Sequence, residues 1–491
     1  VLSRLIFRLE ICITDINTTS TLNNFMIQEK LNLRYVFFLA IVAAIGGFLF
    51  GYDTAVISGT TSQVKQIFNL DSISEGWYVG CALVGSIFGV SIGGLLSDNL
   101  GRKNSLIISA ILFCASAIWC SVAGSFDILI IARILGGVGI GIVSIVSPLY
   151  ISEISIPQYR GRMVALYQLA VTVGFLGAYL MNFALLNYSK GGAADLTNPL
   201  LYQIFHTEVW RSMLGMSVLP ALLFFTILFF IPESPRWLMV KQRYDAASFT
   251  LEHIFGSKSL AEKEKGAIKK SLGENNKIEW RELLKPGILK AVLIGAAIAI
   301  LGQFMGVNAV LYYGPSIFES SGLSGDDSLF YQVIVGLVNV VTTIIAIFII
   351  DKVGRKKLVY FGVTGMIVSL VLIALFFMYG SGMSSIILLI CFLAYVFFCA
   401  ISISAVIWVL LSEMFPNKIR GLAMSIAGFA LWVGTYLIGQ LTPWMLENLS
   451  PAGTFILFAF MSLPYMYIVW KHVPDTTGKS LEDIEKHWKN K

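Results

Sequence analysis

Charged residues and histidines are scarce in this sequence. Only 13% of the 491 residues are charged and four are histidine, whereas a soluble domain carries about 25% charged residues. Hydrophobic residues make up 56% of the chain, and the mean hydropathy is +0.78. This composition argues against a soluble enzyme. At about 20 apolar residues for each spanning helix, it is enough for about a dozen membrane spans.

Cysteine and histidine do not occur in metal-binding patterns. The six cysteines include no CxxC pair and no histidine at ligand spacing, and five of them lie in apolar runs. The sequence therefore indicates neither a zinc site nor a disulfide framework. All four histidines lie outside the apolar runs, so we expect no metal, no cofactor and no enzymatic activity.

Twelve apolar runs, bounded by charged residues, Gly or Pro, predict an all-α integral membrane protein. They are helices because backbone groups in hydrocarbon must form their hydrogen bonds within the segment. The runs lie at about residues 35–59, 77–97, 104–122, 127–151, 162–188 and 211–231, and at about 291–318, 330–350, 358–378, 386–411, 421–446 and 453–470. We predict five regions: an N-terminal segment 1–34, a six-helix half 35–231, a helical loop 232–290, a second six-helix half 291–470 and a tail 471–491.

Lysine and arginine are concentrated in one set of loops. The N-terminal segment, the central loop, the tail and the loops after helices 2, 4, 8 and 10 hold 31 of the 35. The opposite loops contain only Lys65 and Lys190, while Arg133 and Arg211 lie within a span or at its start. Positive charge marks cytoplasmic loops, so both termini and the central loop are expected to be cytoplasmic. The net charge of +6 then reports orientation in the inner membrane rather than nucleic-acid binding.

Residues 1–25 do not fit this pattern of spans and loops. The segment mixes polar and apolar residues, and its apolar stretch is too short to span a membrane. We expect either untranslated sequence upstream of a start at Met26 or a cytoplasmic extension, in preference to a cleaved signal peptide.

The loops also reveal an internal repeat. Asp98-Asn-Leu-Gly-Arg102-Lys103 follows helix 2, and Asp351-Lys-Val-Gly-Arg355-Lys356 follows helix 8. Ser-Glu and Arg-Gly pairs likewise follow helices 4 and 10, at Ser152-Glu153 with Arg160-Gly161 and at Ser412-Glu413 with Arg420-Gly421. Two parallel six-helix repeats joined by a long polar loop are typical of a transporter whose halves rock about a midplane site.

Several longer motifs carry a family resemblance. They are Gly51-Tyr-Asp-Thr-Ala-Val-Ile-Ser-Gly59, the two Asp-x-x-Gly-Arg-Lys loops, Pro232-Glu-Ser-Pro-Arg-Trp-Leu238, Gln303-Phe-Met-Gly-Val-Asn-Ala-Val-Leu-Tyr-Tyr313 and Pro474-Asp-Thr-Thr-Gly-Lys-Ser-Leu-Glu482. Over Tyr35 to Trp488 the chain resembles the sugar porter family of the major facilitator superfamily, most closely its bacterial proton-coupled xylose and hexose symporters. The resemblance implies the major facilitator fold, alternating access, and a monosaccharide and a proton as substrates.

Helix 7 carries a group of polar residues. Gln303, Asn308 and Tyr312 are five and four residues apart, which in a continuous helix places them on one broad face. Amides donate and accept hydrogen bonds, as sugar hydroxyls do. Bonds between helices are the alternative role for such residues, and the resemblance favours sugar contact for Gln303 and Asn308.

The resemblance implies three further substrate contacts, namely Gln168 in helix 5, Trp408 in helix 10 and Trp432 in helix 11. A Trp face stacks on the C–H face of a sugar ring, and plain helix packing is the alternative for each Trp. The chain departs from the xylose and glucose members in two ways: Gly302 and Leu431 replace glutamines, and Ser404-Ala405 replaces Gly-Pro. The individual sugar therefore remains open.

Asp53 in helix 1 and Arg133 in helix 4 are the charges inside the predicted spans, apart from residues at the ends of the spans. Ionisable groups at membrane depth are costly and normally functional. For these two the resemblance implies proton coupling, in which protonation of Asp53 releases Arg133. The alternative is a permanently ionised structural pair in a passive facilitator. Ser217 replaces an auxiliary Glu of the xylose symporters, which keeps that alternative open.

The loops of both halves contain matched acids and bases. They are Asp98, Arg102, Glu153, Arg160 and Glu233 in the first half, and Asp351, Arg355, Glu413, Arg420 and Asp475 in the second. The resemblance implies a salt-bridge latch that closes the cytoplasmic side in the outward-facing state, with short helices of loop 6–7 lying on it. For Lys103, Lys356 and Lys357 we expect a topology signal only.

Other functions fit the sequence less well. A drug or organic-ion antiporter of this fold would carry a Gly-Pro signature in helix 5, and residues 162–188 contain no proline. A sugar receptor would be expected to have long signalling tails. We therefore expect a monomeric sugar transporter in the lipid bilayer, a proton symporter or otherwise a uniporter.

Overall fold

The computed structural model describes residues 32–273, 283, 285–380, 384–415 and 419–473. Residues 1–31 of the N-terminal segment lie outside the described part of the chain. The tail after Val473 also lies outside it, and this part of the tail contains Asp475, one of the predicted latch residues. Within the described residues, twelve helices are long and apolar enough to cross a membrane, and each coincides with a run predicted from the sequence.

The first six spans form one half. They are α2 (Leu33–Val56) with a 3₁₀ turn (Ile57–Gly59), α4 (Ser72–Leu100), α5 (Arg102–Ser121), α6 (Phe126–Ile154), α7 (Arg160–Lys190), and α9 (Val209–Gly215) continued by α10 (Val218–Leu228). Short helix α3 (Thr61–Phe68) follows α2. An excursion with a 3₁₀ turn (Gly192–Asp195), α8 (Pro199–Tyr202) and a π-helical turn (Gln203–Thr207) separates α7 from α9.

The second half repeats this plan. Its spans are α14 (Pro286–Phe304) with α15 (Val307–Ser320), α16 (Gly325–Val353), α17 (Arg355–Tyr379), α18 (Ser385–Cys399) joined to α19 (Ala405–Met414) by a π-helical segment (Ala400–Ser404), α20 (Arg420–Asn448) and α21 (Ser450–Lys471). Between the halves lie α11 (Pro235–Val240), α12 (Tyr244–Phe255) and α13 (Lys258–Gly273), the short helices expected in the central loop.

Local sequence signals set several helix ends beyond the apolar runs. The Asp71 carboxylate accepts the backbone N–H of Ser74, which starts α4 five residues before the predicted span. Ser324 caps α16 in the same way through Asp327. Gly101 and Gly354 separate α4 from α5 and α16 from α17 with φ values of 97° and 91°. Glycine adopts this conformation without steric cost, which explains its place in both Asp-x-x-Gly-Arg-Lys loops.

Small residues bring α4 and α6 into close contact. A Cβ atom on Gly137 would lie 2.0 Å from the carbonyl oxygen of Ala82, and one on Gly141 would lie 2.2 Å from that of Ser86. Membrane helices pack closely through such residues. Gly137 and Gly141 of α6 thus serve helix packing.

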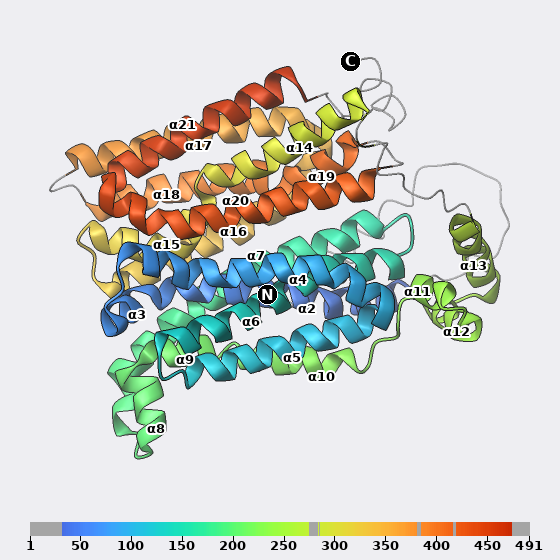
Figure 1. Ribbon diagram of the computed structural model, residues 1–491, viewed down its shortest axis with the longest axis horizontal. Coiled ribbons are helices and arrows are strands. Elements are labelled where there is room, and N and C mark those ends of the chain that lie inside the picture. Colours follow the sequence, from blue (N-terminus) through green and yellow to red (C-terminus); the bar gives the residue numbers. More distant parts are fainter. Residues whose placement is uncertain (1–31, 274–282, 284, 381–383, 416–418, 474–491) are drawn as a thin grey trace.

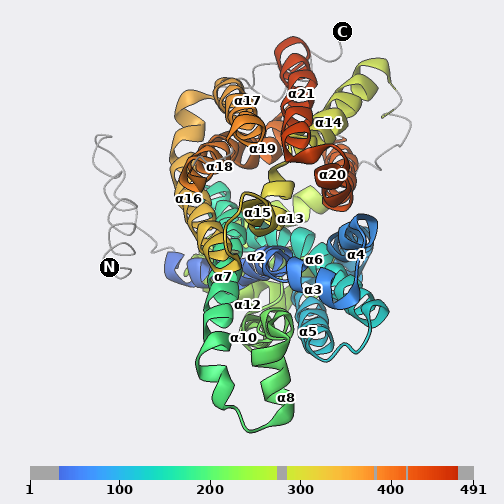
Figure 2. The ribbon, with the colours of Figure 1, turned by 90° about the vertical axis from the view of Figure 1, so that its left-hand side faces the viewer.

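The two halves lie one above the other in Figure 1, and α15 runs between them. In Figure 2, α4 lies beside α20 on one side of the molecule and α7 beside α16 on the other. Two ends of the bundle can be distinguished. The end with the Gly101 and Gly354 turns and α11–α13 is called the basic end, and the opposite end, with α3 and α8, the far end (Figure 1).

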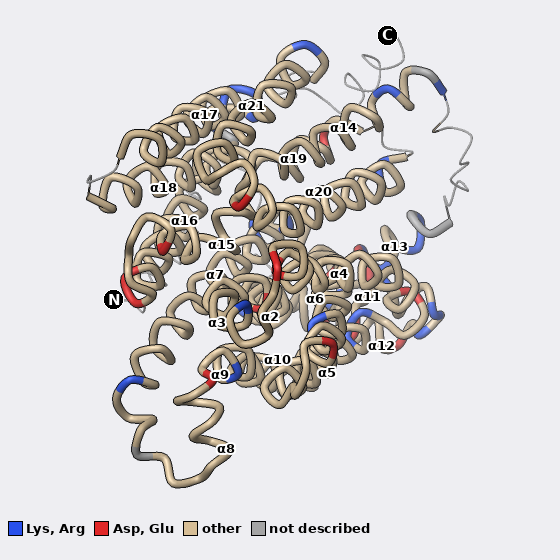
Figure 3. Tube along the Cα trace, turned by 60° about the vertical axis from the view of Figure 1, so that its left-hand side comes forward, with Lys and Arg blue, Asp and Glu red and all other residues tan. Residues whose placement is uncertain are grey.

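The basic end collects most of the described lysines and arginines (Figure 3). At the far end the described chain has Lys65, Lys190 and, at the start of α9, Arg211. The described parts of the loops that the charge pattern assigned to one side of the membrane therefore lie together at one end of the molecule.

Candidate functional site

Helix 7 is broken at the centre of the bundle. The helix α14 ends at Phe304, Gly306 adopts φ +88°, and α15 begins at Val307. The free carbonyl of Met305 accepts a hydrogen bond from the Tyr395 hydroxyl of α18 at 2.7 Å. A Cβ atom on Gly306 would lie 2.3 Å from the Phe458 ring of α21. The expectation of one continuous helix 7 is therefore wrong, because contacts from α18 and α21 stabilise a break that local sequence does not reveal.

The break still leaves two predicted residues in contact. Asn308 donates its amide N–H to Oε1 of Gln303 at 2.7 Å, and the Thr435 hydroxyl of α20 donates to the same oxygen at 3.2 Å. Both Gln303 and Asn308 are half-buried. In the described part of the chain, the Gln303 NH₂ group and the Asn308 carbonyl oxygen have no hydrogen-bond partner, so both can bond a polar molecule.

An aromatic contact joins the halves next to this amide pair. Trp432 of α20 is buried, and its ring centroid lies 5.7 Å from that of Phe50 in α2. Thr435 is three residues after Trp432 and therefore on the same helix face. Sequence reasoning missed Thr435 and Phe50. The spacing to Trp432 would have indicated Thr435, whereas nothing in the sequence pairs Phe50 with Trp432.

In the described chain, no hydrogen bond links the other three predicted sugar contacts to Gln303 or Asn308. Gln168 is half-buried on α7, Tyr312 is buried in α15, and Trp408 is 40% exposed on α19. The Trp408 ring faces Gly428 of α20, where a Cβ atom would lie 3.7 Å away.

Two departures from the family pattern, Ser404-Ala405 and Gly302, can be located in the structure. The π-helical segment Ala400–Ser404 ends where Ser404-Ala405 replaces Gly-Pro, one turn before Trp408. A side chain at Gly302 would point toward Tyr465, 3.6 Å away, and Ile403, 3.8 Å away. A glutamine there would thus project toward α21 and the π-helical segment.

Asp53 and Arg133 form a buried contact in the first half. Arg133 Nη1 lies 3.4 Å from both Asp53 Oδ2 and the Asp53 carbonyl oxygen. Arg133 is 2% exposed and Asp53 is 7% exposed. A Cβ atom on nearby Gly136 would lie 2.5 Å from the Ser116 hydroxyl oxygen but 3.8 Å from Asp53 Oδ1, so this glycine allows α6 to approach α5 rather than making room for the carboxylate. Arg133 Nε lacks a hydrogen-bond partner in the described residues, so the pair is in contact but incompletely satisfied.

Four of the five predicted acids and bases of the first half, Asp98, Arg102, Glu153 and Glu233, form one cluster at the basic end. Arg102 binds Glu153 through two hydrogen bonds of 2.9 Å and reaches Asp98 at 3.3 Å. Glu233 accepts the backbone N–H groups of Arg102 and Lys103, at 2.9 and 3.1 Å, at the start of α5. Burial raises the pKa of the Glu233 carboxyl above its ordinary value, and these hydrogen bonds oppose that effect. Trp237 of α11 donates to the Asp98 carbonyl at 3.0 Å, which seats the loop helices on the cluster.

The predicted acids and bases of the second half make fewer ion pairs with one another than those of the first half, among the described residues. Arg355 pairs with Glu413 at 3.0 Å, and Arg420 donates to the Phe415 carbonyl at 3.4 Å. Arg160 in the first half is exposed. Asp351 lies in α16, but its side chain lies outside the described part of the structure. All described ion pairs of these residues stay within one half, so in this conformation they do not join the halves.

Lys103 and Lys356 have a structural role that the sequence analysis missed. Lys103 Nζ donates to the Phe229 carbonyl at the end of α10, at 2.9 Å. Lys356 Nζ donates to the Trp470 and Val473 carbonyls at the end of α21, at 3.1 and 3.0 Å. The interpretation of these two lysines as a topology signal alone is wrong, because each caps the last helix of its half.

Comparison with known families decides the identity of this arrangement. The sequence profile of the family described as "Sugar (and other) transporter" matches residues 39–488. The chain belongs to this sugar transporter family. Its members are transporters, and the match spans both halves of the bundle and the loop between them.

Relatives of this sugar transporter are similar along nearly their whole length. The arabinose-proton symporter of Bacillus subtilis is 37% identical, over 96% of this chain and 99% of its own. The D-xylose-proton symporter of Escherichia coli K12 is 36% identical, over 94% and 97%. The glucose transporter GlcP of Staphylococcus epidermidis is 35% identical, over 92% and 96%.

Solved structures of a related symporter have the same fold. The inward open conformation of the xylose transporter XylE from Escherichia coli matches with a TM-score of 0.78, at 34% identity over 92% of this chain and 100% of its own. The proton:xylose symporter XylE of the major facilitator superfamily, bound to 6-bromo-6-deoxy-D-glucose, matches with a TM-score of 0.76, at 35% identity over 93% and 100%. The predicted fold, twelve spans in two six-helix halves, is confirmed. The sugar transporter is a multi-pass membrane protein.

Proposed function

We propose that this protein is a monosaccharide:proton symporter that works by alternating access. The sugar binds between the halves, and Asp53 carries the proton. The names of its relatives, arabinose-proton and D-xylose-proton symporters, support both substrates. The observation that carries the proposal is the arrangement of two sites on α2: Phe50 packs on Trp432, and Asp53, one helical turn later, contacts Arg133.

Sugar recognition rests on the amide pair and the tryptophan. Sugar hydroxyls replace the Asn308–Gln303 hydrogen bond and use the unpaired NH₂ of Gln303, while the Trp432 face covers the apolar side of the ring. Because bonds are exchanged rather than added, each amide contributes about 0.5–1.5 kcal/mol to affinity. Gln168, Tyr312 and Trp408 are proposed to contact the sugar once the halves close on it.

Proton coupling rests on the incomplete satisfaction of the buried pair. With Asp53 ionised, Arg133 is held against α2 at 3.4 Å. A proton on Asp53 removes the attraction and frees the guanidinium, which lets α2 move against α6. Since Phe50 lies on the same helix, that movement changes the packing on Trp432 and couples the two substrates.

The basic end is proposed to face the cytoplasm, in accord with the preference of Lys and Arg for cytoplasmic loops. Both termini then lie on that side of the cytoplasmic membrane, and the protein acts as a monomer. The clusters around Arg102 and Arg355 are proposed to meet when the cytoplasmic side closes. The far end faces the outside.

The deciding experiment is transport in proteoliposomes with a panel of labelled arabinose, xylose and glucose. We expect counterflow of at least one sugar without a pH gradient, and accumulation when an inward proton gradient is imposed. A protonophore should abolish only the accumulation. Counterflow without any gradient-driven accumulation would instead establish a uniporter, and absence of counterflow for every monosaccharide would exclude this substrate class.

A further inference from the structure

The far end contains two lysines in its loops, and both are paired with acids. Lys65 binds Glu75 at 2.7 Å within the first half. Lys190, at the end of α7, forms an ion pair with Asp326 in the first turn of α16, and so joins the two halves. Positive charge in loops on the translocated side opposes correct orientation. A lysine kept there therefore calls for a structural or functional reason.

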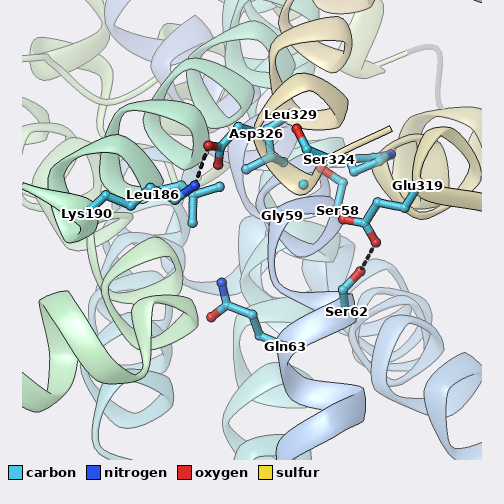
Figure 4. A pocket seen from close by; sticks show the side chains of 12 residues that line it. Ser58, Gly59, Ser62, Gln63, Leu186, Lys190, Glu319, Ser324, Asp326 and Leu329 are labelled. Atoms are coloured by element: carbon cyan, nitrogen blue, oxygen red, sulfur yellow. Dashed lines mark hydrogen bonds and ion pairs between the residues drawn. The ribbon is translucent and has the colours of Figure 1, made fainter. Parts of the chain in front are cut away.

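A second polar contact joins the halves nearby. The Ser62 hydroxyl of α3 donates to Glu319 Oε2 of α15 at 2.9 Å. Figure 4 shows that this bond and the Lys190–Asp326 pair lie on opposite sides of one pocket. The pocket has a volume of about 270 Å³ and is lined by residues of both halves, among them Ser58, Gln63 and Leu329.

The other polar contacts between the halves are also far from the basic end. Gln440 of α20 donates to the Ile73 carbonyl at the start of α4, at 2.9 Å. The Tyr179 hydroxyl of α7 donates to the Leu311 carbonyl of α15 at 2.8 Å. Between described residues, all hydrogen bonds and ion pairs that join the halves thus lie in the far part of the bundle.

We propose that Lys190–Asp326 and Ser62–Glu319 form an outer clasp, a pair of contacts that holds the far end closed and must break for the far end to open. The proposal rests on the proposed function only for the identification of the far end as the outside. Both contacts consist of side chains from opposite halves, so they exist only in the closed state and favour it over the open one.

The clasp is weak enough to allow turnover. Lys190 and Asp326 retain 58% and 35% side-chain exposure, and an exposed pair of this kind changes an equilibrium constant by about 1.5- to 5-fold. Salt screens such a pair. The clasp therefore adjusts the populations of the inward- and outward-facing states without locking either of them.

Asp326→Asn tests the clasp, and Asp327→Asn is its matched control. Both carboxylates lie in the first turn of α16, so either change removes one charge from the same helix N-terminus. Only Asp326 pairs with the other half, whereas Asp327 bonds Ser324 of its own loop. Spin labels on exposed Asn187 of α7 and Asn448 of α20, in full-length protein without its native cysteines, report the distance across the far end.

We expect Asp326→Asn to raise the ratio of long to short distances by about 1.5- to 5-fold, and Asp327→Asn to leave it unchanged. Lys190→Gln should match Asp326→Asn, and the double variant should add nothing further, because both changes break the same contact. An equal effect of Asp326→Asn and Asp327→Asn, or no effect of either, overturns the clasp. The distances are measured without sugar, so failure of the proposed function would appear separately, as absence of counterflow in the same preparation.

Discussion

Gln303 is held in place by more hydrogen bonds than the other predicted sugar contacts among the described residues. Its Oε1 accepts hydrogen bonds from Asn308 and Thr435, which fixes the amide plane and turns the NH₂ group to an unpaired position. Because a free hydroxyl or amide in the bundle costs energy, such a group is best satisfied by a substrate with several hydroxyls.

Replacing either amide should weaken sugar binding without loss of protein. We expect Gln303→Ala or Asn308→Ala to reduce affinity about 2- to 12-fold, the range for one uncharged hydrogen bond. The measurement is the concentration dependence of sugar counterflow. Ser369→Ala is the control, since this buried hydroxyl bonds only to Gly365 of its own helix among the described residues. Unchanged affinity in both amide variants would remove helix 7 from the site.

Asp53 separates a symporter from a facilitator. Asn at this position resembles permanently protonated Asp, so Asp53→Asn should abolish gradient-driven accumulation and preserve counterflow, which needs no net proton movement. If the pair is purely structural, the variant leaves Arg133 buried and unpaired at a cost of about 3–5 kcal/mol, and folding and both transport modes should fall together. Accumulation that persists in Asp53→Asn would show that the proton is carried elsewhere.

At the scale of the element, the break in helix 7 is the feature that shapes the site. Gln303 and Asn308 lie on either side of the break and form a hydrogen bond across it. Gly306 permits the break through its positive φ, and the Phe458 ring leaves no room for a Cβ atom.

Gly306→Ala should therefore cost stability as well as affinity. The left-handed conformation alone costs about 1–2 kcal/mol for a residue with a side chain, and the contact with Phe458 adds to it. We expect a lower unfolding temperature in detergent and weaker counterflow. Gly266→Ala in α13, where a Cβ atom meets nothing within 4 Å, should be neutral or slightly stabilising. Equal behaviour of the two variants would mean that the break is not required.

At the scale of the whole molecule, the two ends are connected differently. The described ion pairs at the basic end stay within each half, whereas at the far end the Lys190–Asp326 pair crosses between the halves. In a two-state transporter, contacts at one end favour the conformation in which that end is closed. In the described conformation the Ser62–Glu319 and Lys190–Asp326 contacts hold the halves together at the far end, which corresponds to a closed far end.

Loss of Arg102 or Arg355 should shift the whole molecule further toward this state. If their clusters meet when the basic end closes, Arg102→Ala and Arg355→Ala destabilise the outward-facing conformation. Labelling of a single cysteine placed in the far-end pocket should then slow, measured from the outside of intact cells. Lys265→Ala, which breaks an ion pair inside α13, should leave the rate unchanged. No slowing in either arginine variant would count against a latch at the basic end.

The sequence by itself determined the twelve spans, the two halves and the distribution of charge, because hydropathy and loop charge are local properties that a bilayer reads segment by segment. It also indicated Asp53 and Arg133 as partners, since isolated charges in apolar spans require one. Tertiary structure alone decided the break at Gly306, the meeting of Thr435 with Gln303 and the packing of Phe50 on Trp432. Each of these depends on residues 90 or more positions apart in the chain. It also decided which charges join the halves, because that depends on which end of the transporter is closed.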